Sequence, residues 1–356
     1  MVKPEVTVIT PTYNERENVV KLIEELDRCF KEAGITYEVV VVDDNSPDGT
    51  AEAVEGLMSK YPVKLVRRPS KLGLTSAVFD GLKYAEGTYV VVMDADLQHP
   101  PEVVPKLYVK ALEGYDLVIA SRYVSGGSAK FPLHRLIVSL GATLIARVLI
   151  PKARKVKDPM SGFFLVKKDV ISKITPTSPK SYKVLLEVLA LGSYRNVYEV
   201  PYEFRERVVG KSKLGFKTML NYVKQVLNLT PDYVRFALVG ASGTVVNLGV
   251  LAVLRYVANL THEIASALAI EASIINNFVW NDLWTFKGGR SGSVASRLIK
   301  FHFSSAVGVI TQYVISLTTY YYIVRNSIIA QSIGILTGFI INYVLSKKFV
   351  WSPRRF

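Results

Sequence analysis

The stretch Thr88-Tyr89-Val90-Val91-Val92-Met93-Asp94-Ala95-Asp96-Leu97-Gln98 decides the fold of this 356-residue chain. Its first six residues are mostly β-branched, aromatic or apolar, which is typical of a buried strand. A polar cluster follows directly. Asp94, Asp96 and Gln98 stand at alternate positions, so their oxygens can converge on one hard cation such as Mg²⁺ or Mn²⁺. A polar turn without a metal is the alternative interpretation of the same residues.

The residues around this stretch alternate between strand and helix patterns. We expect strands at 6–10, 37–42, 63–67, 88–93 and 117–121, and helices at 18–33, 50–60 and 75–84. Strands separated by helices predict an α/β fold with a doubly wound, mostly parallel sheet. In such sheets, ligands bind outside the carboxyl ends of the strands.

Two further polar clusters also stand at strand ends. After the second expected strand comes Asp43-Asp44-Asn45-Ser46, in which Asp44 can accept hydrogen bonds from a base or ribose while its neighbours cap the next helix. After the first comes Pro11-Thr12-Tyr13-Asn14-Glu15, in which Tyr13 can stack on a base and Glu15 can accept from its N–H groups. No G-x-G-x-x-G motif is present, which argues against a dinucleotide cofactor.

The composition narrows the class of partner. The net charge is +14, and 49% of the residues are hydrophobic. Anionic lipid and phosphorylated substrates fit this balance better than nucleic acid, because no nucleic-acid-binding motif is present. Cys29 is the only cysteine, so no intrachain disulfide can form. The chain opens on a strand-like run rather than a secretory signal, and we expect the first half to be cytosolic.

The second half of the chain is predicted to lie in a membrane. Four apolar segments, at 233–254, 263–283, 299–323 and 328–350, are each close to the roughly 20 residues that a helix needs to cross the bilayer. An internal repeat has a constant offset of 65 residues (300 − 235 and 342 − 277). It aligns Gly243 with Gly308 and Asn277 with Asn342. We therefore predict a domain at 1–230 and a membrane domain at 231–356, built from two copies of a helix pair with parallel topology.

Flanking cations predict the orientation of the membrane domain. One side holds nine basic residues: Arg235, Lys287, Arg290, Arg297, Lys300, Lys347, Lys348, Arg354 and Arg355. The other side holds Arg255 and Arg325. Because cations are concentrated on the cytoplasmic side of membrane proteins, we expect a multi-pass protein of the cell membrane, with its first domain and both termini in the cytoplasm.

Two shorter amphipathic stretches, at 133–150 and 215–229, are predicted to be helices lying in the membrane interface. Ordinary core helices are the alternative. Basic residues gather in this part of the chain: Arg122, Arg135, Arg205, Arg207, Lys211 and Lys213. Any one of them alone would be expected on a solvated face. As a set beside two interfacial helices, they suit a site that receives phosphate from both a nucleotide and a lipid.

Three blocks, at 6–15, 41–46 and 93–100, resemble the signature of family 2 glycosyltransferases with the GT-A fold. Further blocks, at 96–101, 121–123 and 158–164, make the chain similar to the dolichol-phosphate mannose synthases of that family. This resemblance covers about residues 5–230. The tail resembles the GtrA-like membrane domain with four transmembrane helices. The Q-x-x-R-W motif of processive family 2 enzymes is absent, in keeping with transfer of one sugar.

The resemblance implies a role for particular residues. It implies guanosine binding by a first set: Pro11, Tyr13, Glu15, Val42 and Asp44. It implies nucleotide-sugar and metal binding at the second cluster, with Asp94, Ala95 and Asp96 on the diphosphate, and Asp94, Asp96 and Gln98 on Mg²⁺ or Mn²⁺. Arg122, Arg207 and Lys213 would contact phosphate or sugar and, with Asp96, form the catalytic set. Arg122, Arg135 and Ser139 are the candidates for the lipid phosphate.

The expected reaction is inverting, metal-dependent transfer of mannose from GDP-mannose to dolichyl or another polyprenyl phosphate. Because the product is a lipid and the second half of the chain is apolar, we expect the lipid bilayer as a third partner, besides GDP-mannose and the polyprenyl phosphate. A polyprenyl-phosphate glucosyltransferase that uses UDP-glucose is an alternative from the same class. A sugar-lipid transporter or flippase, whose first domain only senses nucleotide sugar, is an alternative from another class, because repeats are common in transporters.

Overall fold

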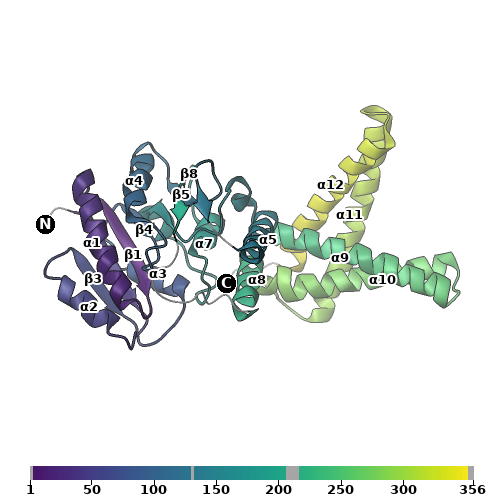
Figure 1. Ribbon diagram of the computed structural model, residues 1–356. Coiled ribbons are helices and arrows are strands. Elements are labelled where there is room, and N and C mark those ends of the chain that lie inside the picture. Colours follow the sequence, from purple (N-terminus) through teal and green to yellow (C-terminus); the bar gives the residue numbers. More distant parts are fainter. Residues whose placement is uncertain (1–2, 130–131, 206–215, 352–356) are drawn as a thin grey trace. The chain divides into compact units, whose positions relative to one another are not determined.

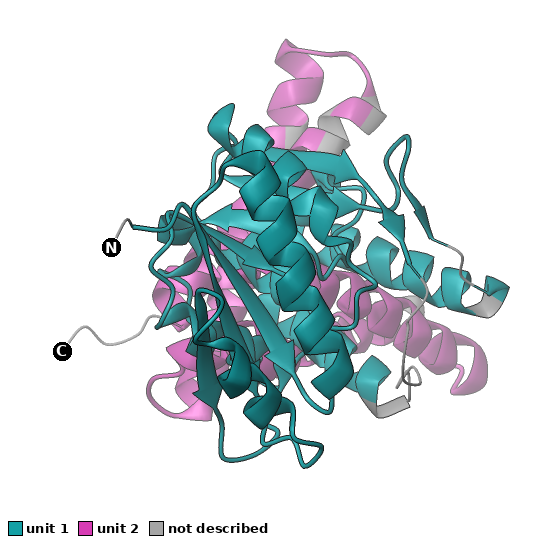
Figure 2. Cartoon of the chain, turned by 60° about the vertical axis from the view of Figure 1, so that its left-hand side comes forward, with its two compact units in different colours: residues 1–230 teal, residues 231–356 magenta. Residues whose placement is uncertain are grey.

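The structure, a computed structural model, describes residues 3–129, 132–205 and 216–351 (Figure 1). The chain forms two compact units, residues 1–230 and 231–356 (Figure 2). The first unit holds every strand that the structure describes, and the second unit is helical.

A seven-stranded sheet in the order β3-β2-β1-β4-β7-β5-β8 forms the centre of the described part of the first unit. Its strands are β1 Val6–Thr12, β2 Tyr37–Asp43, β3 Val63–Arg67, β4 Tyr89–Val92, β5 Leu117–Ser121, β7 Phe164–Lys167 and β8 Val197–Pro201. Four of the neighbouring pairs are parallel, and the two pairs that include β7 are antiparallel. The predicted α/β fold with a mostly parallel sheet is confirmed. A small parallel pair, β6 Ser128–Ala129 with β9 Glu203–Phe204, lies apart from this sheet.

The sheet has a hydrophobic core on each face, because successive side chains of a strand point to opposite sides. On β2, Val39 and Val41 face one core, and Val40 and Val42 face the other. The first core is covered by α1 Arg16–Ala33, α2 Thr50–Leu57 and α4 Val104–Leu112. The second is covered by α3 Leu74–Leu82, α5 Leu133–Leu149, α7 Val184–Leu191 and α8 Phe216–Leu229. Three short helices complete the unit: η1 Pro101–Val103, η2 Pro151–Lys155 and α6 Lys168–Ile171.

Helix α1 shows how local sequence builds this layer. Val19, Leu22, Ile23, Leu26 and Phe30 recur at helical spacing and are all fully buried, so one stripe of the helix packs on the sheet. The helix ends at Gly34, whose φ of 67° lies in the left-handed region that glycine adopts without strain.

Helices α5 and α8 present apolar side chains on their outer faces. On α5 these recur at helical spacing and are 49–73% exposed: Leu133, Ile137, Leu140, Leu144 and Val148. On α8 the corresponding residues are Met219, Leu220 and Val223, and the opposite face buries Tyr222 and Val226. An outward apolar face of this size is typical of a contact with lipid or protein. The predicted placement of α5 and α8 in the membrane interface is compatible with this geometry and stays a prediction.

Among the described residues, the second unit has four long helices: α9 Asp232–Ala252, α10 His262–Trp280, α11 Val294–Tyr322 and α12 Ser327–Leu345. Three segments are long and apolar enough to cross a membrane: Asp232–Val257, Val294–Tyr322 and Ile333–Val350. Helix α10, which carries Glu271, Asn276 and Asn277, is not among them. Of the four spans predicted from the sequence, the described residues thus support three by length and composition.

The 65-residue offset recurs in the geometry of the second unit. Helices α10 and α12 end at equivalent positions, and each continues into a π-helical segment, η4 Asn281–Thr285 or η6 Ser346–Val350. A Cβ atom placed on Gly243 would collide with Asn277, and one placed on Gly308 would collide with the equivalent Asn342. Each pair of helices therefore packs through the same close approach of a glycine to an asparagine. An aromatic core joins the two pairs, and it includes Phe236, its equivalent Phe301, Phe286 and its equivalent Trp351.

Two ion pairs link the copies in a reciprocal way. Arg297 pairs with Asp282 (Nε to Oδ1, 2.7 Å), and both side chains are at least 90% buried. Lys347 pairs with Asp232 (Nζ to Oδ2, 3.2 Å) at a more exposed position. Asp232 is the repeat equivalent of Arg297, and Asp282 is the equivalent of Lys347. The first copy therefore supplies both acids, and the second copy supplies both bases.

Candidate active site

The register of the sheet brings the three polar clusters together. Thr12 of β1 pairs with Asp43 of β2, and Ile9 of β1 pairs with Val92 of β4. The clusters that follow β1, β2 and β4 therefore lie side by side at the carboxyl edge of the parallel strands. This is the edge at which α/β sheets bind their ligands.

The antiparallel strand β7 delivers a fourth segment to the same edge. Because β7 runs opposite to β4 and β5, the residues that precede it lie where those two strands end. Asp158, in this segment, is fully buried and accepts hydrogen bonds from Nε and Nη2 of Arg122, each at 2.7 Å, and from the Arg122 backbone N–H at 3.0 Å. Burial disfavours the Arg122 cation, but Asp158 outweighs it and raises the pKa of the guanidinium above its ordinary value. Arg122 is thus a cation held in a fixed position directly after β5.

The Asp94-Ala95-Asp96 turn presents its two carboxylates differently. The Asp94 side chain is 45% exposed, whereas Asp96 is 3% exposed and its Oδ1 accepts from the backbone N–H of Gln98 at 3.2 Å. Leu97 has a φ of 59°, which bends the chain sharply after the second carboxylate. Gln98 donates through Nε2 to the carbonyl of Arg205 at 3.0 Å, which leaves its Oε1 as the atom that could meet a cation.

This donor set fits a divalent metal only when a phosphate completes it. No cluster of three or more His, Cys, Asp or Glu side chains that could hold a metal occurs in the described residues. Two carboxylates and an amide oxygen nevertheless match the preference of Mg²⁺, which commonly binds one or two carboxylates together with substrate phosphates and water. The residues present are therefore compatible with Mg²⁺ or Mn²⁺ held jointly with a diphosphate.

The buried His99 is bonded to the Asp94-Ala95-Asp96 turn, and the sequence analysis gave this residue no role. The imidazole Nδ1 accepts a hydrogen bond from the backbone N–H of Asp94 at 3.0 Å, and the ring stacks on Phe163 with centroids 5.2 Å apart. Burial lowers the pKa of His99 to about 4, so the ring is neutral at pH 7 and its Nδ1 can act as an acceptor. A Cβ on Gly162 would approach His99 Cε1 to 3.2 Å, and this residue therefore lets the loop before β7 lie close to the turn.

The end of the site that is predicted to bind the nucleoside, around Tyr13, Glu15 and Asp44 (the nucleoside end), contains charged residues that the sequence did not single out. Lys71 Nζ lies 4.0 Å from the centroid of the Tyr13 ring, and Arg68 Nη1 lies 2.8 Å from Asp44 Oδ1. Arg68 is buried, and burial raises the pKa of Asp44 against the opposing effect of Arg68 and Lys71. Glu15 accepts from Asn18 Nδ2 at 2.7 Å. The tandem Arg67-Arg68 at the end of β3 was the signal that could have indicated a buried cation here.

Two of the predicted site residues, Val42 and Ala95, present little side chain to a ligand. Val42 is fully buried in the core, and Ala95 is 2% exposed, whereas Pro11 is half-buried. Val42 and Ala95 could meet a nucleotide mainly through their backbone atoms.

The candidates for the lipid phosphate lie around Tyr123. The Tyr123 hydroxyl and Ser139 Oγ are 2.9 Å apart, and the Arg122 guanidinium lies 5.4 Å from the Tyr123 ring centroid. Arg135 and Ser139 are half-buried and one helical turn apart on α5. Ser139 and Arg122 are thus brought together through Tyr123. Lys183, which sequence reasoning missed, donates through Nζ to the carbonyl of Met160 at 2.7 Å, in the same loop as Asp158.

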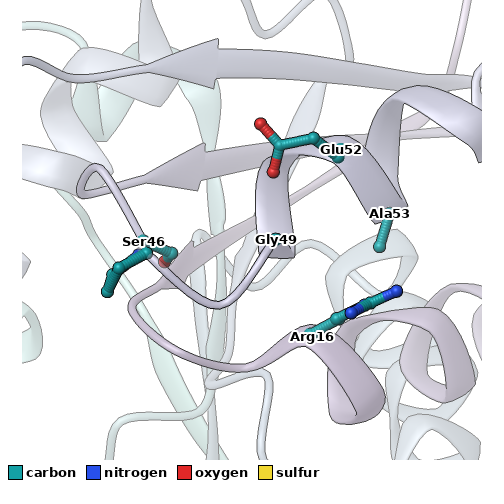
Figure 3. Close-up of a pocket in the computed structure, with 6 residues that line it drawn as sticks. Arg16, Ser46, Gly49, Glu52 and Ala53 are labelled. Carbon is teal, nitrogen blue, oxygen red and sulfur yellow. The ribbon is translucent and has the colours of Figure 1, made fainter.

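Arg207, Lys211 and Lys213 lie outside the described residues, so their predicted roles stay predictions. Arg205, just before them, pairs with Glu102. A pocket beside the nucleoside end is lined by Arg16, Ser46, Pro47, Gly49, Glu52 and Ala53 (Figure 3). It lies between the starts of α1 and α2, and it contains none of the predicted site residues.

The fold and this site define a class of protein, and the sequence comparisons agree. Residues 7–175 match the family Glycosyl transferase family 2, and residues 235–351 match the family GtrA/DPMS, transmembrane domain. The chain belongs to the membrane-bound family 2 glycosyltransferases.

More particularly, it belongs with the dolichol-phosphate mannosyltransferases. It is 43% identical to the dolichol-phosphate mannosyltransferase of Pyrococcus furiosus, over 98% of this chain and 99% of that protein. The enzyme of the same name from Saccharomyces cerevisiae is 39% identical over 63% of this chain and 86% of its own length. Among solved structures, glucosyl-3-phosphoglycerate synthase of M. tuberculosis is similar over 64% of this chain and 79% of that chain, with 21% identity and a TM-score of 0.48.

Proposed function

We propose that this protein transfers mannose from GDP-mannose to dolichyl or another polyprenyl phosphate and inverts the anomeric carbon. The observation that carries the proposal is the similarity to a dolichol-phosphate mannosyltransferase along almost the entire chain, both units included. The site supports it, because a carboxylate turn and a buried arginine lie at one edge of the sheet. The first suits a diphosphate that is bound through a divalent metal, and the second suits a phosphate acceptor.

Residues at the ends of β1, β2 and β4 would bind the donor. Tyr13, Glu15 and Asp44 would take the guanosine, with Pro11 and the backbone of Val42 beside it. Asp94, Asp96 and Gln98 would hold Mg²⁺ or Mn²⁺, which supplies positive charge to the departing diphosphate. His99 would keep Asp94 in place through the hydrogen bond to its backbone N–H.

The acceptor needs no general base. A polyprenyl phosphate is already an anionic nucleophile at neutral pH, unlike a sugar hydroxyl. The task of the protein is therefore to hold two anionic groups together and in line, which basic side chains do. Arg122, fixed by Asp158, and Arg135 and Ser139 on α5 would orient the lipid phosphate. Attack from the face opposite the leaving diphosphate gives a β-linked product from an α-linked donor.

The apolar helices would bring the enzyme to its substrate. The outer faces of α5 and α8 would lie in the membrane interface, and the second unit would cross the bilayer. The distribution of cations along the chain supports a cytoplasmic location for the first unit and both termini.

The proposal is tested by incubating detergent-solubilised protein with a polyprenyl phosphate and either GDP-mannose or UDP-glucose, followed by mass analysis of the lipid. A mannosyl phosphate formed from GDP-mannose is expected. Glucosyl phosphate formed from UDP-glucose instead would overturn the sugar and nucleotide assignment. Absence of any glycosylated lipid would favour a protein that only moves sugar lipids.

A further inference from the structure

Lys183 has a charge that the reaction described above does not use. It lies directly before α7, and its Nζ donates to the carbonyl of Met160 at 2.7 Å. Met160 belongs to the same loop as Asp158, the residue that fixes Arg122. In the described residues, Met160 O is the one hydrogen-bond acceptor that Lys183 Nζ meets, and an ammonium group has three N–H donors. The half-buried ammonium also lies 5.3 Å from the centroid of the Tyr182 ring, and two of its N–H donors are available to a ligand.

The charges around Lys183 are those of the active site. Burial and the nearby Arg122 are the main causes that lower the pKa of Lys183 to about 8, with a further contribution from Arg135, whereas Asp94 and Asp158 oppose the shift. Asp158 is engaged by Arg122 through both of its carboxylate oxygens. Two carboxylates, Asp94 and Asp158, therefore lie near three cations, and Asp158 is already paired with Arg122. The remaining excess of positive charge favours an anionic ligand.

The position of Lys183 is fixed from the opposite side by α8. Gln225 is fully buried on α8, and its Nε2 donates to the backbone carbonyl of Lys183 at 2.8 Å and to Glu187 Oε1 at 3.2 Å. The backbone of Lys183 is therefore held by one neighbour and its ammonium by another. A side chain that is fixed at both ends is prepared to meet a ligand at a defined place.

We propose that Lys183 is a phosphate-binding residue of the transfer reaction, acting as a third cation with Arg122 and Arg135. Its partner Met160 lies in the loop that runs from Asp158, which binds Arg122, to Gly162, where a Cβ atom would lie 3.6 Å from Asp94 Oδ2. Phosphate is expected at both ends of this loop. The phosphate that it contacts belongs to the donor diphosphate, to the lipid acceptor, or to both. This inference rests on the proposed function for the identity of the substrates but not for the anionic character of the ligand.

The test compares wild-type full-length protein with Lys183→Met, Lys183→Arg and the exposed control Lys173→Met. Calorimetry measures binding of two probes, GDP with Mn²⁺ and geranyl phosphate. Steady-state kinetics with GDP-mannose and a polyprenyl phosphate gives kcat and KM for each substrate, and the melting temperature of every variant reports on folding.

The methionine variant is expected to bind at least one probe about 10- to 100-fold more weakly, the range for loss of a hydrogen bond to a charged group. Weaker binding of GDP alone assigns Lys183 to the donor, and weaker binding of geranyl phosphate alone assigns it to the acceptor. Loss of both places it on both phosphates. The arginine variant should recover part of the affinity because it keeps the charge, and Lys173→Met should match wild type.

Two outcomes would overturn the inference. One is binding of both probes by Lys183→Met within about twofold of wild type, since loss of a charged hydrogen bond costs more than that. The other is an equal loss in the methionine and arginine variants together with a lower melting temperature, which would indicate a purely structural role. If wild-type protein binds both probes but forms no mannosyl lipid, the proposed function fails, while the role of Lys183 is still decided by the binding measurements.

Discussion

Asp158→Leu should separate the stability of the first unit from its activity. The wild-type carboxylate accepts three hydrogen bonds from Arg122, and the two side chains are 0% and 9% exposed. Leucine removes the acceptor and leaves a guanidinium buried without its counter-charge. Breaking a buried ion pair in this way costs about 3–5 kcal/mol. For a unit of this size each kcal/mol corresponds to about 2–4 °C, so the melting temperature should fall by about 10 °C.

The double variant Arg122→Met/Asp158→Leu tests the cause of that loss. Two apolar side chains of suitable volume can replace a buried ion pair at little cost, so the double variant should recover most of the lost stability. Its transferase activity should stay low, because the cation that orients the acceptor phosphate is gone. Thermal unfolding in detergent and a sugar-transfer assay measure the two effects.

The exposed pair Lys110–Glu113 provides the control. Glu113→Ala should change the stability by less than about 1 kcal/mol, because exposed ion pairs contribute little. The reasoning is refuted if Asp158→Leu melts at the wild-type temperature, or if the double variant is less stable than the single one.

Three further predictions concern other parts of the molecule. Asp96→Ala should lower turnover by at least about 100-fold, and a chelator should do the same to wild-type protein until Mn²⁺ or Mg²⁺ is restored; full activity in the chelator contradicts the metal assignment. Burial opposes ionisation of Glu38, but hydrogen bonds from Lys64, Thr7 and the Glu86 backbone outweigh it and lower its pKa. Glu38→Gln should therefore destabilise the protein by about 1–3 kcal/mol at pH 7. That difference should shrink as the pH falls below about 4.3 through the lower pKa of the folded state, and a difference independent of pH would disprove the linkage. Gly243→Ala should cost about 1–3 kcal/mol by overpacking against Asn277, whereas Gly240→Ala, with open space at its Cβ, should be tolerated; melting temperatures that do not differ would show that the close approach is unimportant.

The parts of the fold that could be predicted from the sequence are those that depend on local sequence patterns. The strands β1 to β5 were placed within two residues at each end, because an apolar run followed by a polar cluster marks where a buried strand stops. Strands β7 and β8 were missed. The position of β7 between β4 and β5 depends on pairing between segments far apart in the chain, and four residues carry too little pattern to reveal it.

The same limit applies to the site. That Tyr13, Asp44 and Asp94 lie at one edge of the sheet could be predicted, because they follow parallel strands whose carboxyl ends must meet. The partner of Arg122 could not be predicted, since Asp158 comes to it only through the antiparallel course of β7. Lys183 and Arg68 look like surface residues in the sequence, and no local pattern predicts that the first is half-buried and the second buried. Arg207 and Lys213 lie outside the described residues, and their roles remain predictions.

The division of charge between the two helix pairs constrains how this half of the chain can change over time. One helix pair holds Asp232 and Asp282, and the other holds Arg297 and Lys347. Two copies of the first helix pair, packed together in the same way, would place carboxylates opposite carboxylates. Neither pair can therefore substitute for the other, although they share a common pattern. A reversal of charge at the buried Asp282 or Arg297 is expected to be tolerated only with a matching reversal in its partner. The two helix pairs thus share one pattern of packing, while their charges favour contact between unlike copies over contact between like ones.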